Sequence, residues 1–118
     1  MTAAAKVPLP PSLDVALLGH YEGLDDAQVR GFLAGHPRVA ALLVAAIPEV
    51  ERVFGPQARV ALATEAERSG AITLYATILD DPSLNTEEQV ARLRRFDASW
   101  WLAQDRSAGP VAFTVGDA

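Results

Sequence analysis

Few residues in this sequence have the type and spacing that catalysis requires. The two histidines, His20 and His36, are sixteen residues apart and form no HxxxH or HExxH pattern that would hold a metal ion. The chain has no cysteine, which excludes thiol catalysis, disulfides and cysteine-based metal sites. The GxSxG nucleophile elbow and the phosphate-binding patterns GxxxxGK[ST] and GxGxxG are also missing. The sequence therefore predicts no catalytic residue, no metal ligand and no cofactor; His36 is better explained as a cap before Pro37, and His20 as a surface residue.

One acid stands out by its position on a helix. A helix is predicted over Asn85–Ala103, and a wheel drawn at 100° per residue gathers its large apolar side chains on one arc. That arc holds Val90, Leu93, Phe96, Trp100 and Trp101. Asp97 falls on the same arc and is too short to reach water from a buried position. We expect it to be a structural acid that bonds Arg94 or an indole N–H; the alternative is a polar anchor in a pocket or interface.

The two tryptophans of this helix are expected to differ in burial. Trp100 lies well inside the apolar arc and is predicted to be core, whereas Trp101 lies at its edge and is predicted to stay near the surface, where tryptophan often anchors a partner. Arg94, Asp97, Trp101 and Tyr75 are therefore the candidate interface or structural polar residues. The three arginines of the helix are explained as a solvated face that pairs with Glu87 and Glu88, one to two turns back; they are Arg92, Arg94 and Arg95.

The remaining acid pairs are explained by local structure. Asp80-Asp81-Pro82 is predicted to be a turn, because a site for a hard cation would need further oxygen ligands in an organised loop. Asp25-Asp26 is predicted to start a helix, where negative charge suits the helix dipole.

Periodicity and turn residues predict the other elements. Helices are expected over Leu24–Gly35 and Pro37–Phe54; the second is either one helix kinked at Pro48 or two short helices that meet at Ile47. Strands are expected over Ala58–Thr64, Ala71–Leu79 and Val111–Val115, the first two as an antiparallel hairpin. Ser12–Tyr21 can be a short helix or an edge strand, and helix is favoured.

These elements predict a single α+β domain over residues 12–118, preceded by an extended, proline-rich arm at Met1–Pro11. The expected architecture is a small antiparallel sheet of about three strands with helices packed on one face, in the order α-α-β-β-α-β. Thr73, Tyr75, Thr77 and Thr114 then lie on the other face, which is either wet or paired with another subunit.

Composition limits the classes of partner. The 118 residues carry a net charge of −5, so no basic patch is large enough to make nucleic acid the main partner. No apolar run approaches the roughly 20 residues that cross a bilayer, and the first residues do not resemble a signal peptide. We therefore expect a bacterial, cytoplasmic protein that binds neither membrane nor nucleic acid and forms a homodimer or a complex with another protein.

The segment RRFDASWWL, followed by a turn and a final strand, resembles a group of small uncharacterised bacterial proteins with a C-terminal RFDxxWWL-type helix. The resemblance covers roughly Val50–Val115 and rests on this one motif. It implies the order of elements and no activity.

Two functions follow from these observations. The first is a non-catalytic, acidic protein-interaction module, such as an accessory, antitoxin-like or regulatory subunit. The second is a small-molecule binder or unusual enzyme that uses a pocket near Asp97 and Tyr75.

Overall fold

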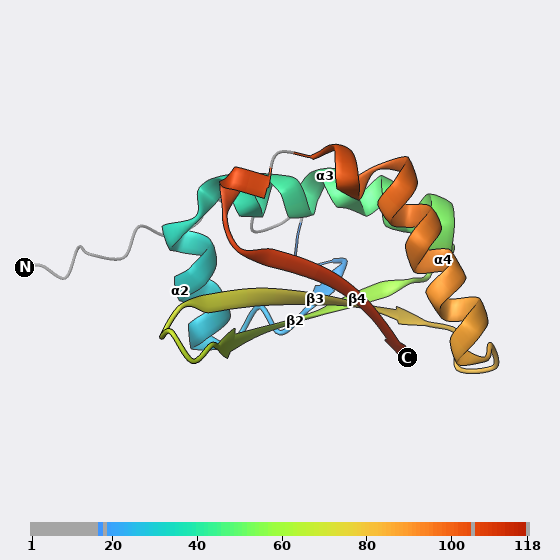
Figure 1. Ribbon diagram of the computed structural model, residues 1–118, viewed down its shortest axis with the longest axis horizontal. Coiled ribbons are helices and arrows are strands. Elements are labelled where there is room, and N and C mark those ends of the chain that lie inside the picture. Colours follow the sequence, from blue (N-terminus) through green and yellow to red (C-terminus); the bar gives the residue numbers. More distant parts are fainter. Residues whose placement is uncertain (1–16, 18, 105, 118) are drawn as a thin grey trace, which may run out of the picture.

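The computed structural model of the chain describes Leu17, residues 19–104 and residues 106–117 (Figure 1). Its elements follow one another along the chain as a short strand, two helices, a hairpin, a third helix with two 3₁₀ turns, and a last strand. They are β1 (Tyr21–Glu22), α2 (Ala27–Gly35), α3 (Pro37–Phe54), β2 (Arg59–Ala66), β3 (Ile72–Asp80), α4 (Thr86–Ser99), η2 (Trp101–Ala103), η3 (Arg106–Ala108) and β4 (Val111–Asp117). This confirms the α+β class and the predicted order of the main elements.

The four strands form one sheet in the order β1-β2-β3-β4. Only β2 and β3 are antiparallel; β1 runs parallel to β2, and β4 runs parallel to β3. The expectation of an antiparallel sheet is therefore wrong at both edges. The reason is the connection: a strand that follows a helical crossover returns in the same direction, and α4 is such a crossover between β3 and β4.

The helix ends use the capping chemistry that the sequence carries. The Asp26 carboxylate accepts the Gln28 and Val29 N–H groups at 2.8 and 3.1 Å, so Asp26 is the cap of α2. At the start of α4, Asn85 and Glu88 form a reciprocal capping box with bonds of 2.8 and 3.1 Å.

The helix α3 continues without a break through Pro48, which lies on its exposed side. This confirms that the segment forms one helix and not two short helices that meet at Ile47; the predicted kink at Pro48 stays a prediction. The exposed position lets the proline ring face water, while the apolar side of the helix stays in the core.

The core lies between the helices and one face of the sheet (Figure 1). The strand residues on this face alternate with those on the other face, as the pleat requires. The fully buried side chains include Leu74, Ile78, Val39, Leu43 and Phe96. The buried Tyr21 donates its hydroxyl to the Leu43 carbonyl at 2.6 Å and so places α3 above β1.

The opposite face of the sheet carries Thr73, Tyr75, Thr77 and Leu79 from β3 and Ala112 and Thr114 from β4. The Thr77 and Thr114 hydroxyls lie 3.0 Å apart and share a hydrogen bond across the two strands. All three described helices lie on the other side, so none of them covers this face. This agrees with the prediction of one strongly apolar face.

Two expectations fall on residues that the structure does not describe. The proline-rich arm Met1–Pro11 lies outside the described residues, as does most of Ser12–Tyr21. No single helix in the described ranges is both long and apolar enough to cross a membrane; α2 and α3 reach that length only as a pair bent by 104°.

Candidate functional site

Asp97 lies in the last two turns of α4 and is half-buried. Its Oδ1 atom is buried and accepts no hydrogen bond from a described residue, and burial raises the pKa of the carboxyl above its usual value. The expected bond to Arg94 or to an indole N–H is not present, so this prediction is wrong. The Arg94 side chain is exposed, and both indole rings pack against other aromatic rings.

Tyr75 and Asp97 are not in one site. The neighbours of Tyr75 in β3, Leu74 and Ala76, are fully buried under the helices, and successive side chains of a strand point to opposite faces. Tyr75 therefore lies on the uncovered face, while Asp97 belongs to a helix on the covered face. The sheet separates the two residues, so one pocket cannot hold both.

The predicted burial of the two tryptophans is reversed. Trp101 is only 6% exposed, whereas Trp100 is partly buried. The prediction assumed one helix up to Ala103, but α4 ends at Ser99 and Trp100 has φ −147° and ψ −55°. The wheel therefore no longer applies beyond Ser99, and the Trp101 ring packs edge-on against Phe113 with centroids 4.8 Å apart.

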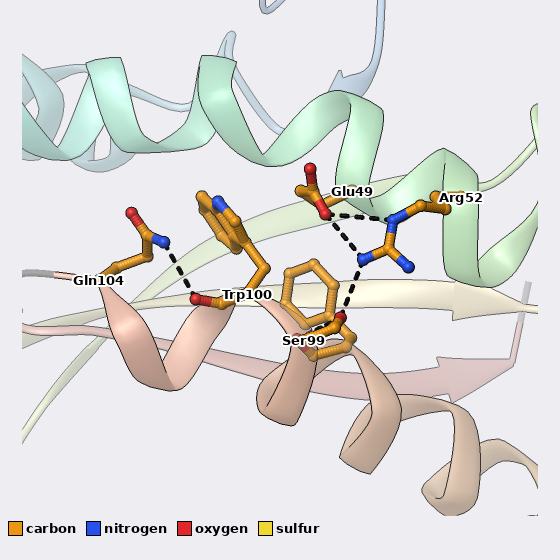
Figure 2. A network of polar contacts seen from close by, with 6 residues as sticks. Glu49, Arg52, Ser99, Trp100 and Gln104 are labelled. Atoms are coloured by element: carbon orange, nitrogen blue, oxygen red, sulfur yellow. Dashed lines mark hydrogen bonds and ion pairs between the residues drawn. The ribbon is translucent and has the colours of Figure 1, made fainter.

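The end of α4 is held against α3 by a polar network (Figure 2). The Arg52 guanidinium donates to the Glu49 carboxylate at 2.8 Å and to the Ser99 hydroxyl at 2.9 Å. The Gln104 amide donates to the Trp100 carbonyl at 3.0 Å. These side chains lie at the surface, so the network orients two helices and adds little stability.

A buried ion pair lies at the C-terminal end of β3, where the sequence predicts only a turn. Asp80 is 2% exposed, and its Oδ1 lies 3.2 Å from an Arg92 nitrogen and accepts the Asp81 N–H at 2.8 Å. Arg92 also donates to the Phe54 carbonyl at 2.8 Å and lies over the Phe54 ring at 5.4 Å. The cluster joins the ends of α3, β3 and α4.

This acid could have been found from the strand pattern. Leu74, Ala76 and Ile78 alternate on the buried face, and Asp80 continues the same alternation. The second carboxylate oxygen of Asp80 and the Arg92 Nε have no hydrogen-bond partner among the described residues, and both atoms belong to this one ion pair. A bidentate contact between the two groups would satisfy both atoms, which favours a structural role.

An open groove of about 500 Å³ lies beside α2 and is lined mostly by apolar side chains. Its lining comprises Gln28, Gly31, Phe32, His36, Ala71, Ile72 and Pro110. His36 occupies the shared cap position between α2 and α3, but its ring does not cap α3. Instead, its Nδ1 lies 2.9 Å from the Phe32 carbonyl, and its ring stacks on Phe32 with centroids 4.2 Å apart.

The free edge of β4 is the most extended unpaired polar surface of the described sheet. The Pro110 carbonyl accepts the Leu74 N–H at 2.9 Å, and alternate residues of a parallel strand bond to opposite sides. Ala112 and Thr114 therefore bond to β3, while the N–H and C=O groups of alternate residues point outward. These outward residues are Val111, Phe113 and Val115.

The described side chains form no cluster of three or more histidines and acids that could hold a metal ion. Comparison with known proteins finds no matching family model, no matching curated protein and no matching solved structure. The function of the protein can therefore be inferred only from its own geometry.

Proposed function

We propose that the protein is a non-catalytic interaction module that binds a protein partner, a second copy or another chain, along the free edge of β4. The observation that carries this proposal is the row of outward N–H and C=O groups on a seven-residue strand that pairs with no described strand on that side. Such an edge adds a strand from a partner through main-chain hydrogen bonds.

The β4 edge lacks the features that keep other edge strands from pairing. Residues 111–116 contain no charged side chain and no proline, and the register with β3 runs without a bulge from Val111 to Asp117. The opposite edge of the sheet is different. There β1 covers part of β2, and Gly23 approaches so closely that an added Cβ would lie 2.5 Å from the Leu62 carbonyl oxygen.

The proposal also includes a cytoplasmic location, which the lack of cysteine supports because cytosolic thiols stay reduced and structural disulfides are rare there.

A second candidate is the binding of a small molecule, and the groove beside α2 favours it over the expected pocket near Asp97 and Tyr75. The groove has the volume and apolar lining that are usual for such sites. Because a carbonyl oxygen only accepts, the His36 Nδ1 donates to the Phe32 carbonyl, and Nε2 is the ring nitrogen left to bond a ligand. NMR signals of the His36 ring, followed during a screen of small aromatic compounds, test this function; signals that no compound shifts would contradict it.

The edge is tested with a proline that removes one outward N–H group. Val115→Pro should leave the β3 ladder intact, because the Val115 N–H points away from β3. Val115→Thr is the matched control, since it keeps the N–H and the branched shape. We expect sedimentation velocity to show association for the wild type and for Val115→Thr, and a monomer for Val115→Pro. A wild-type chain that stays monomeric at every concentration and captures no partner from a lysate would contradict the proposal.

A further inference from the structure

We infer that the partner on the β4 edge is a second copy of this chain, and that Arg94 of each copy binds Asp97 of the other. This inference rests on the proposed function and gives it a specific interface. It follows from the register of β4, the position of α4 above it, and the charges on the outer flank of α4.

The residues of β4 allow two copies of this strand to pair in one symmetric register. Two β4 strands that run antiparallel about a two-fold axis at Thr114 use all seven residues of each strand. Phe113 then faces Val115 of the other copy, and both residues carry outward N–H and C=O groups, so they form a hydrogen-bonded pair. No like charges face each other, because Val111 lies opposite Asp117.

The same register continues a row of threonines across the interface. Thr77 and Thr114 already share a hydrogen bond on the uncovered face. The two-fold axis places Thr114 next to Thr114 of the second copy, so four threonines lie in line. Threonine pairs across strands stabilise a sheet.

The position of α4 above the sheet brings the α4 helices of two paired copies together. The Phe96 ring of α4 and the Trp100 ring, which directly follows α4, pack on Phe113 of β4 with centroids 5.2 and 6.4 Å from that of Phe113. As the crossover between β3 and β4, α4 lies above these two strands. With strands about 4.8 Å apart, two such helices related by the axis lie about 9–10 Å apart. This matches the 8–10 Å at which helices pack in proteins.

The outer flank of α4, formed by Val90, Arg94 and Asp97, is the side that a second copy would meet. Arg92 and Ser99 contact residues of α3, and Val90, Arg94 and Asp97 lie about 140–180° round the helix from them. This flank therefore faces away from α3, toward the free edge of the sheet. An open hollow of about 660 Å³ runs along it, lined by Thr86, Glu87, Val90, Ala91 and Arg94.

The charges on this flank complement themselves. Asp97 is half-buried, its Oδ1 has no hydrogen-bond partner in the described part of the chain, and burial raises the pKa of its carboxyl. Arg94 is exposed one turn away and makes no hydrogen bond or ion pair with a described residue. Phe96 packs on Phe113, next to Thr114, so we place the two-fold axis at the level of residues 95 and 96 of α4. In that arrangement residue 94 of each copy lies opposite residue 97 of the other, and the dimer contains two Arg94–Asp97 ion pairs.

The test uses two charge reversals, Arg94→Glu and Asp97→Lys. Each variant alone places like charges at both symmetric contacts and should weaken self-association by about tenfold or more. An equimolar mixture should associate again, because the heterodimer pairs Glu at 94 with Lys at 97 and keeps the native pair at the second contact. An ion pair within one chain cannot produce this rescue. The double variant should likewise dimerise as the wild type does.

Arg95→Glu is the control, since Arg95 is an exposed cation of the same helix that faces away from this flank. It should leave dimerisation unchanged. Dimers that are sensitive to Val115→Pro but show no rescue on mixing would overturn the Arg94–Asp97 exchange and leave the edge function standing. A wild-type chain that is monomeric but binds another protein through β4 would overturn the second copy as the partner.

Discussion

Removing either half of the ion pair between Asp80 and Arg92 should destabilise the fold by different amounts. The Asp80 side chain is 1% exposed and that of Arg92 is 26% exposed. Arg92→Met leaves a buried carboxylate without its cation, which should cost about 3–5 kcal/mol of unfolding free energy. Asp80→Ala should cost less, about 2–4 kcal/mol, because Arg92 can turn toward water and keeps its bond to the Phe54 carbonyl.

The double variant Asp80→Leu with Arg92→Met tests whether the two charges stabilise the fold only as a pair. Apolar side chains of similar size remove both charges, so the variant should lie within about 1–2 kcal/mol of the wild type. Urea melts followed by tryptophan fluorescence give the free energies of unfolding of the reference protein, the two single variants and the double variant. All four also carry Val115→Pro, so that self-association does not contribute to the measured stability. Single variants that each cost less than about 1 kcal/mol, or a double variant with the summed loss, would refute a coupled structural pair.

Two further variants test the core. Tyr21→Phe should cost about 0.5–1.5 kcal/mol at neutral pH, since it removes the buried hydrogen bond to the Leu43 carbonyl. Burial raises the pKa of the Tyr21 hydroxyl above its usual value near 10, so its stabilising contribution is present below about pH 10 and falls as the pH rises further. Tyr21→Phe should therefore lose less stability than the wild type in alkaline melts, and equal losses would count against this account. Trp101→Ala should cost about 3–5 kcal/mol and more than Trp100→Ala, because Trp101 is the more buried ring; the reverse order in urea melts would contradict the packing.

The order of the main elements could be predicted because local signals agree with the fold. The capping box at Asn85 and Glu88, the proline at the start of α3 and the alternation of β3 each act within a few residues. An edge strand is predicted only as the alternative for Ser12–Tyr21, and the position of β1 could not be predicted. Two residues give no periodicity, and the pairing of Tyr21 with Val60 is made by tertiary contacts.

The polar residues were predicted less well, for a physical reason. A helical wheel assumes one buried face, but α4 packs against both the sheet and α3. Arg92 therefore contacts Asp80 and Phe54 although it lies opposite the apolar arc. Trp101 is buried because the helix ends before it, and no residue near Ser99 is of a type that predicts a helix end.

Hydrogen exchange at individual amides of β4 tests the central claim most directly. The Ala112 and Thr114 amides bond to β3 and should be protected at every protein concentration. The Phe113 and Val115 amides point outward and should exchange fast in dilute solution, then become protected as the concentration rises. If these two amides exchange at the same fast rate in concentrated and dilute samples, β4 does not pair with a second copy.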